Sequence, residues 1–450
     1  MADKEYFENF SYCFIPFSFS NEKGIKYFDE RLTVGEVWHP VHDEVRYLHK
    51  YVSDKLINDD CEKKGCFHYH LDKKAAEFYN LHLEESNYYI APKKYFNKND
   101  VEIRFSINNV ELFAFSTSLG ILAFQIKFED NDIRKIAAAQ YYMRKISYQK
   151  ESEKVKYRSC YGEIEDYDFI KISKSLFRDL KSDFVFDFFF YSAPKHARAN
   201  FLTYVDVDKK DNYDEDLFYL KWCYHDAFSY DPVSDLEDSQ NYVASSDIVW
   251  GISPSAAVCL VYRSKERAEF IEGVFQKNFM EQYLFTYILL LHQKYMMYYL
   301  LTEIGCADNS NLEALENYKK RCYEFQTDYM FSYITEVPQY QRLYERVSKS
   351  FKLEEMFRDV QEPLTRLAEI QRQLRDEEEK QCDKAMNHML SLLSVLTVFS
   401  AIADAAGITA NLGWMLNTGV SRSIQVITTG LSLIFTAIVV IELYKLRKKK

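Results

Sequence analysis

Glycine and proline are scarce in this chain, which has 12 and 8 of them among 450 residues. Because these residues form most tight turns, their scarcity excludes a turn-rich all-β protein and favours long helices. The sequence also lacks a glycine-rich phosphate-binding loop, a nucleophile elbow and the paired histidines of zinc proteases. We therefore predict that the protein is not an enzyme.

A positive net charge is missing too. The formal net charge is −11, so we expect no direct binding of nucleic acid. The nine cysteines are scattered and odd in number, and we interpret them as reduced thiols in a cytosolic compartment. The N-terminal stretch MADKEYFENFSY lacks the basic segment and apolar core of a cleavable signal peptide. Insertion into a membrane would have to come from elsewhere in the chain.

Two apolar stretches near the C-terminus are long enough to cross a bilayer as helices. Residues 389–414 carry one charge, Asp404, and residues 424–444 carry only Glu442. We predict a first span at 386–414, an external loop at 415–423, a second span at 424–444 and a basic tail at 445–450. The basic tail places that end in the cytoplasm, and two spans return the chain to the same side. We therefore expect an inner-membrane protein with both termini in the cytoplasm. A buried helical hairpin in a soluble core is the alternative.

A third apolar stretch, residues 279–301, has a different composition. It contains Glu281, His292 and Lys294, and charges within a membrane span are costly. We interpret it as a long amphipathic helix in a soluble bundle.

Residues 1–262 have the mixed pattern of an α+β cytoplasmic sensing domain. Alternating apolar residues predict strands at 101–107, 110–116 and 121–128, with Asn108 and Asn109 as a turn. Asp132 is a candidate N-cap for a helix over 132–146. Further strands are expected at 184–191 and 256–262, and an acidic loop at 206–216.

The character of the chain becomes helical from about residue 264. We expect helices at 264–304, ending at Gly305, at 311–337, ending before Pro338, and from Gln339 to an interruption at Pro363. From Leu364 the pattern runs into the first span without a breaker, so a helix through Leu412 would be about 73 Å long. We expect residues 263–385 to form a helical stalk. Its charged residues cannot all be buried in one chain, which favours several copies packed side by side.

The stalk, the two spans and the basic tail resemble the CorA-type divalent-cation channels. The first span has Thr397 and Phe399, followed by Ala406, Gly407 and Ile408, at the spacing of that family. The resemblance covers residues 264–450, and the N-terminal part shares only the general fold. It implies a homopentamer in membrane lipid, with a cytoplasmic α+β domain, long stalk helices and a two-helix transmembrane hairpin.

The family signature glycine-methionine-asparagine is altered here to Ala410, Asn411 and Leu412. This chain is therefore similar to the CorA-like subgroup that lacks the signature and is associated with type III CRISPR systems. That resemblance implies a membrane effector of antiviral defence, a channel opened by a nucleotide second messenger such as an S-adenosylmethionine–AMP conjugate. The alternative is ordinary divalent-cation transport. The residues themselves predict no cofactor, and the family makes Mg2+ or another divalent cation the candidate.

Two faces of the first span could line a pore. A seam with a period of about 3.5 residues collects most polar side chains of the span. Its predicted pore-lining members are Asn387, Leu390, Ser394, Thr397, Asp404 and Asn411. In a pentamer Asp404 would form a ring of carboxylates, which selects cations. The rival face is apolar and would gate by dewetting. It consists of Met386, Met389, Leu393, Leu396, Ser400, Ala403 and Gly407.

Two further groups of residues could bind ligands. Cys61, Cys66, His68 and His70 are candidate zinc ligands, with an ordinary polar strand as the alternative. A messenger site needs cations for phosphate and aromatic rings for the base. The candidates are basic residues interleaved with Tyr141, Tyr142 and Tyr157, and a solvated surface is the alternative. They are Arg134, Lys135, Arg144, Lys145 and Arg158.

Overall fold

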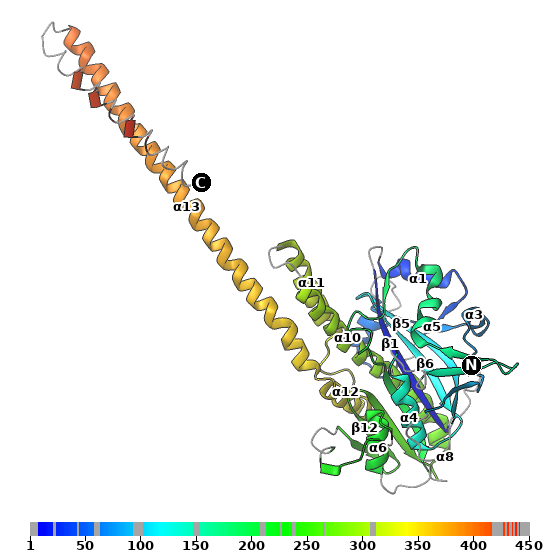
Figure 1. Ribbon diagram of the computed structural model, residues 1–450. Coiled ribbons are helices and arrows are strands. Elements are labelled where there is room, and N and C mark those ends of the chain that lie inside the picture. The colour runs from blue at the N-terminus through cyan, green and yellow to red at the C-terminus, as the bar shows by residue number, and fades with distance from the viewer. Residues whose placement is uncertain are drawn as a thin grey trace. The chain divides into compact units, whose positions relative to one another are not determined.

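The structure is a computed structural model (Figure 1). It describes residues 8–20, 24–42, 45–57, 64–92, 102–146, 154–207, 213–225, 227–233, 235, 240–263, 266–306, 312–415, 426, 427, 430, 431, 434, 437, 438 and 441. The chain divides into two compact units, Met1–Glu362 and Pro363–Lys450. The first unit therefore continues past residue 262, through helices that we expected to belong to the stalk.

The first unit is built on one mixed sheet, so the expected α+β class is confirmed. The main path is β11-β12-β13-β10-β1-β6-β5-β4-β7-β8, with β3 joining β2 to β5 and β9 pairing with β1. The pairing of β10 with β13 is parallel, whereas β1 is antiparallel to both β6 and β10. The strands are β1 (Asn9–Phe19), β2 (Trp38–Pro40), β3 (Cys66–Leu71), β4 (Tyr88–Ile90), β5 (Ile103–Phe115), β6 (Leu119–Phe128), β7 (Val155–Arg158), β8 (Ile164–Tyr167), β9 (Phe186–Asp187), β10 (Asn200–Val207), β11 (Tyr242–Ser245), β12 (Ile248–Ile252) and β13 (Ala256–Tyr262).

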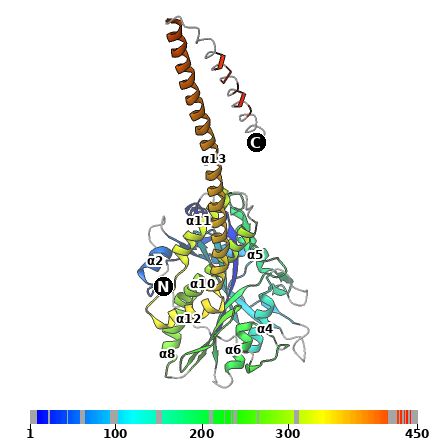
Figure 2. The ribbon, with the colours of Figure 1, turned by 90° about the vertical axis from the view of Figure 1, so that its left-hand side faces the viewer.

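Helices cover both faces of this sheet, with α1 and α5 on one side and α10 on the other (Figure 1). In a view from another side, α10 and α12 lie next to each other (Figure 2). The helical segments of the first unit are α1 (Ile25–Thr33), α2 (Lys50–Leu56), α3 (Lys73–Phe78), α4 (Ile133–Met143), α5 (Phe169–Leu176), η2 (Arg178–Leu180), α6 (Tyr213–Trp222), α8 (Ala268–Phe270), η3 (Ile271–Phe275), α9 (Gln276–Asn278), η4 (Phe279–Tyr283), α10 (Leu284–Cys306), α11 (Leu312–Tyr329) and α12 (Pro338–Ser350). Helix α13 (Leu353–Met415) begins in the first unit and continues into the second.

The central strand β1 explains why both faces are covered. Its residues Cys13, Ile15 and Phe17 join the core that packs under α4, α5 and α6. The alternate residues face the other helical layer, where the ring of Phe10 lies 5.5 Å from Phe279 and that of Phe14 lies 5.4 Å from Tyr287. A strand buried on both faces is mostly apolar, as β1 is apart from Asn9, Ser11 and Ser18.

Several local predictions are confirmed. Strand β6 covers the expected 121–128, and β13 coincides with 256–262. Asp132 caps α4, because its side chain accepts hydrogen bonds from the backbone N–H groups of Arg134 and Lys135. Residues 279–301 lie inside the first unit, but they are buried nearly all round rather than amphipathic.

Other local predictions are wrong. Asn108 and Asn109 form no turn, because β5 runs through them as one strand with a β-bulge between Ile107 and Asn109. The strand expected at 184–191 is only the short β9. Within 206–216, β10 extends to Val207 and α6 begins at Tyr213, and residues 208–212 lie outside the described residues.

The helix breaks also differ from the prediction. Gly305 lies within α10, and Pro363 lies within α13 instead of interrupting it. Proline removes one backbone hydrogen bond, and a long helix keeps its turns on either side. The break falls instead at Lys352, whose positive φ of 55° separates α12 from α13.

The second unit contains the stretch Arg375–Asp404, long and apolar enough to cross a membrane and without buried residues in this single chain. Among the described residues it is the one helix that meets this test. Of the second predicted span, the described residues from 426 to 441 are each helical, and the rest of 424–444, the loop residues 416–423 and the tail 445–450 lie outside the described part.

Candidate functional site

The predicted pore-lining residues lie on the exposed surface of α13. Asn387, Leu390, Ser394, Thr397 and Asp404 are all exposed, as are the apolar residues of the rival face from Met386 to Leu396. Asn411 lies within α13, and its side chain is outside the described residues. A single chain thus leaves both faces available for a pore.

The hydroxyl groups on this helix bond back to its own backbone. Ser394 donates to the carbonyl of Leu390 at 2.8 Å, and Thr397 donates to the carbonyls of Leu393 and Ser394 at 3.0 and 2.8 Å. Such bonds satisfy a hydroxyl without water, which suits an apolar surrounding. Large apolar side chains are exposed beside them, with Met389 67% and Val398 59% exposed. Exposed apolar surface of this kind is typical of a face that contacts lipid or other chains.

The cysteine and histidine candidates lie on β3, apart from Cys61, which is outside the described residues. Cys66 is buried, and His68 pairs through Nε2 with Oε2 of Glu111 at 3.1 Å while its ring stacks on Phe113. His70 lies at the edge beside His39, with ring centroids 5.2 Å apart, and burial followed by the charge of His39 lowers its pKa. The described residues contain no group of three or more His, Cys, Asp or Glu side chains that could hold a metal ion.

Three of the five predicted basic ligands are neutralised by carboxylates. Arg134 pairs with Glu215 at 2.7 Å, Lys135 pairs with Asp130, and Arg158 pairs with Glu102 at 2.6 Å. Arg158 lies on β7, whereas the others lie on α4 or at its end. The structure therefore does not bring the five together as one site.

Arg144, at the end of α4, has a different environment. It donates from Nη1 to the carbonyl of Trp222 at 2.9 Å and from Nη2 to Oγ of Ser255 at 2.8 Å, and its Nε is buried without a hydrogen-bond partner. Its backbone carbonyl accepts from the N–H of Ala199. The start of β10 is thereby held next to the end of α4.

Two further cations share this region, and sequence reasoning missed both. Lys294 of α10 donates to Oδ1 of Asn200 at 3.3 Å and to the carbonyl of Pro254 at 3.2 Å. Burial and then the charge of Arg144 lower the pKa of Lys294 to about 7. Burial and Arg144 also lower the pKa of Arg198. We call Arg144, Arg198 and Lys294 the basic cluster.

The basic cluster forms no ion pair with a carboxylate among the residues that the structure describes. Among the described residues, Arg198 donates to the carbonyls of Lys195 and Ala197 and to no carboxylate. Buried or half-buried cations normally have an acidic partner, so three without one form a region suited to an anion. The sequence could not predict this cluster, because its three residues come from the end of α4, the start of β10 and α10.

Aromatic rings lie beside the basic cluster, because Tyr141 is close enough to Arg198, and Tyr224 close enough to Arg144, for their charges to interact. Lys145 is 4.3 Å from the ring centre of Tyr141, and the rings of Tyr141 and His225 meet edge to face at 4.4 Å. Tyr224 stacks on Phe228 at 4.1 Å. Cations for phosphate and rings for a base are thus adjacent here, as a nucleotide requires.

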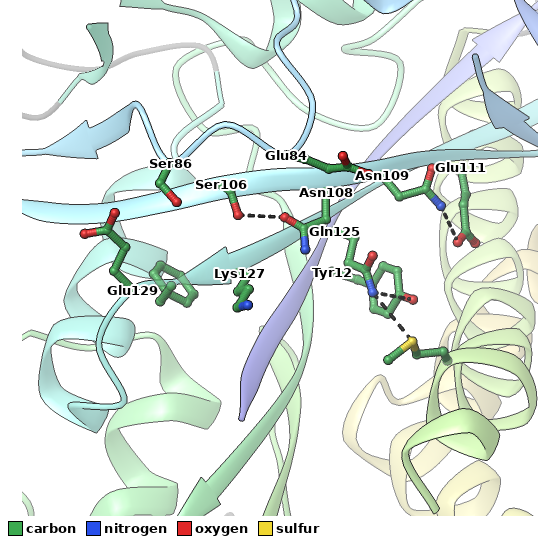
Figure 3. Close-up of a pocket in the computed structure, with 12 residues that line it drawn as sticks. Tyr12, Glu84, Ser86, Ser106, Asn108, Asn109, Glu111, Gln125, Lys127 and Glu129 are labelled. Atoms are coloured by element: carbon green, nitrogen blue, oxygen red, sulfur yellow. Dashed lines mark hydrogen bonds between the residues drawn. The ribbon is translucent and has the colours of Figure 1, made fainter. Parts of the chain in front are cut away.

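A second feature of the first unit is a polar pocket with a cavity of about 450 Å³ on the α10 side of the sheet (Figure 3). A row of side chains from three neighbouring strands forms the floor of the pocket. Gln125 of β6 lies opposite Tyr12 of β1 on one side and opposite Asn109 of β5 on the other. Met280 of η4 completes the floor, with its sulfur 3.7 Å from Nε2 of Gln125.

The β-bulge in β5 explains why two successive asparagines line this pocket. Ile107 and Val110 both belong to the core on the opposite face of the sheet. In a regular strand their positions would alternate, but the extra residue lets Asn108 and Asn109 both line the pocket. Ser106 fixes Asn108 by donating to its Oδ1 at 2.6 Å.

Comparisons with models of protein families, with curated proteins and with solved structures find no match to this chain.

Proposed function

We propose that this protein is a ligand-gated membrane effector, in which a nucleotide second messenger binds the first unit and α13 forms a membrane pore. The proposal includes the homopentamer, the two-helix hairpin and the inner-membrane location with both termini in the cytoplasm. It places the protein in antiviral defence of the type III CRISPR kind. The single observation that carries it is the exposed helical stretch Arg375–Asp404, which contains an apolar window of 18 residues and belongs to the same helix that starts in the first unit.

The basic cluster is our candidate for the messenger site. Its cations have no carboxylate partner among the described residues, and Tyr141 and Tyr224 lie close enough to interact with Arg198 and Arg144. A phosphate bound there would supply the missing negative charge. An S-adenosylmethionine–AMP conjugate is the first ligand to test.

The same cluster touches the point where α13 begins. The ammonium group of Lys294 lies 4.4 Å from the ring centre of Phe351, which also contacts Tyr287 of α10 at 6.0 Å. Phe351 precedes Lys352, the residue that separates α12 from α13. An anion that draws Lys294 toward Arg144 would weaken its contact with Phe351. The ligand would then favour one arrangement of this junction, which is the unequal affinity that gating needs.

Flux from liposomes tests the proposal directly. The purified full-length protein is reconstituted with a trapped dye or ion, and efflux is followed with and without the nucleotide. We expect messenger-dependent efflux that is lost in Arg144→Ala and Arg198→Ala. Lys135→Ala is the matched control, because Lys135 is already paired with Asp130. Efflux that ignores the messenger, or that survives both cluster variants, would contradict the proposal.

Divalent-cation transport is the second candidate function. The observation in its favour is the carboxylate of Asp404, exposed on α13 in register with Thr397 and Ser394. With Mg2+ or another divalent cation as the transported ion, flux would proceed without nucleotide. The same liposomes, loaded with a Mg2+-sensitive dye, distinguish the two candidates.

A further inference from the structure

The polar pocket is not used by the proposed messenger site, and its chemistry is different. Its lining contains the carboxylates of Glu84, Glu111 and Glu129 and, among the described lining residues, one cation, Lys127. Lys127 offsets one of the three negative charges and the ion pair of Glu84 with Lys73 offsets another, which leaves one in excess. A phosphate would be repelled here, whereas a positively charged ligand would be attracted.

The pocket also contains hydrogen-bond acceptors to which no described residue donates. The side chain of Gln125 is 7% exposed, and its Nε2 donates to the hydroxyl of Tyr12 and to the sulfur of Met280. No described residue donates to its Oε1. The carboxylate of Glu129 has no partner among the described residues, and Glu84 also pairs with Lys73. A ligand rich in N–H groups would satisfy these oxygens.

The spread of the carboxylates excludes a compact ion as the best occupant. Glu129 lies toward one end of the pocket and Glu111 toward the other, with Lys127, Asn108 and Gln125 between them (Figure 3). The described acidic side chains do not converge into a group that could hold a metal ion. Between the ends, Tyr12, Phe128 and Met280 provide apolar surface. Separated negative charges joined by an apolar floor match cationic groups joined by methylene carbons.

We propose that this pocket binds a small linear organic amine with two or more positive charges, of the polyamine class. Its ammonium groups would lie at Glu129 and Glu111, and its methylene chain would cover Tyr12 and Met280. The volume of about 450 Å³ lies within the range of small-molecule sites, about 300–1,000 Å³. This site is separate from the basic cluster and does not depend on the proposed gating.

Calorimetric titration of the full-length protein in detergent with spermidine tests the assignment. We expect saturable binding that weakens at least tenfold in Glu129→Gln and in Gln125→Leu. Glu129 is exposed, so its substitution should leave the fold intact. Glu163→Gln is the matched control, an exposed glutamate outside the pocket, and should bind spermidine as the wild type does.

Each other outcome overturns the assignment. Equal weakening in Glu163→Gln and Glu129→Gln would mean that spermidine binds only to the general negative surface. Competition by Mg2+ at the same concentration as spermidine would mean that charge alone is recognised. Binding of AMP that is lost in Gln125→Leu would make the pocket a nucleotide site. Absence of saturable spermidine binding to the wild type would overturn the assignment and leave the proposed function intact, because messenger-dependent efflux tests that function separately.

Discussion

His292 makes the stability of the first unit depend on pH, and the size of the effect follows from its surroundings. The side chain is fully buried on α10, where its ring stacks on Phe115 at 3.8 Å and its Nε2 is hydrogen-bonded to the hydroxyl of Thr117 at 2.7 Å. Its Nδ1 is buried without a partner. Burial lowers the pKa of His292 from 6.5 to about 3. The folded protein therefore holds this imidazole neutral over the acidic range in which the unfolded chain protonates it.

The sign and size of this pH effect follow from the linkage between proton binding and folding. Between pH 6.5 and pH 3 the unfolded state binds the extra proton, so stability falls as the pH falls through this window. From pH 7 to pH 5, a group with an unfolded pKa of 6.5 contributes a loss of about 2 kcal/mol. This figure hardly changes for any folded pKa below about 4, because the folded protein then remains unprotonated at pH 5.

Denaturant unfolding of the full-length protein in detergent, followed by tryptophan fluorescence, measures the effect in wild type and His292→Leu. The variant loses the bond to Thr117 and is expected to be less stable at both pH values. Its loss between pH 7 and pH 5 should be smaller than that of the wild type by about 2 kcal/mol. Equal losses in the two proteins would refute the reasoning, since other titrating groups contribute equally to both.

Three further predictions concern other parts of the chain. Asp404→Asn should reduce cation selectivity of reconstituted channels several-fold, and unchanged ion selectivity in liposomes would remove Asp404 from the pore. Because the pKa of Lys294 is lowered to about 7, the unfolded chain binds the extra proton between pH 7 and pH 10.5, so stability should rise by about 2 kcal/mol from pH 7 to pH 9. Lys294→Met should abolish that rise in denaturant unfolding. Gly120→Ala should destabilise the first unit by about 1–3 kcal/mol, since a Cβ would lie 2.2 Å from the buried ring of Phe17. Gly273→Ala, where a Cβ meets no atom within 4 Å, should cost less when both variants are compared by denaturant unfolding.

Local signals in the sequence predicted the local structure well where one interaction decides it. Alternating apolar residues located β6 and β13, and Asp132 located the start of α4 because its carboxylate caps the helix within the next three residues. Length and composition were also enough to identify the apolar stretch of α13.

Predictions failed where a distant contact overrides the local preference. Asn108 and Asn109 are turn residues by propensity, but the pairing of β5 with β6 continues through them and accommodates the extra residue as a bulge. The stretch 279–301 has the charges of an amphipathic helix, yet the sheet, α11 and α12 bury it on nearly every side. Its His292 and Lys294 therefore became buried groups with lowered pKa values.

The sequence by itself determined the composition class, the α+β character of the first unit, the cap of α4 and the apolar length of α13. These depend on residues that are close together along the chain. Only the tertiary structure decided which charges are compensated. It paired Arg134 and Arg158 with carboxylates and brought Arg144, Arg198 and Lys294 together as the basic cluster. It also formed the polar pocket, which Asn108 lines. Electrostatic interactions depend on distance in space and on burial, and the order of residues along the chain specifies neither.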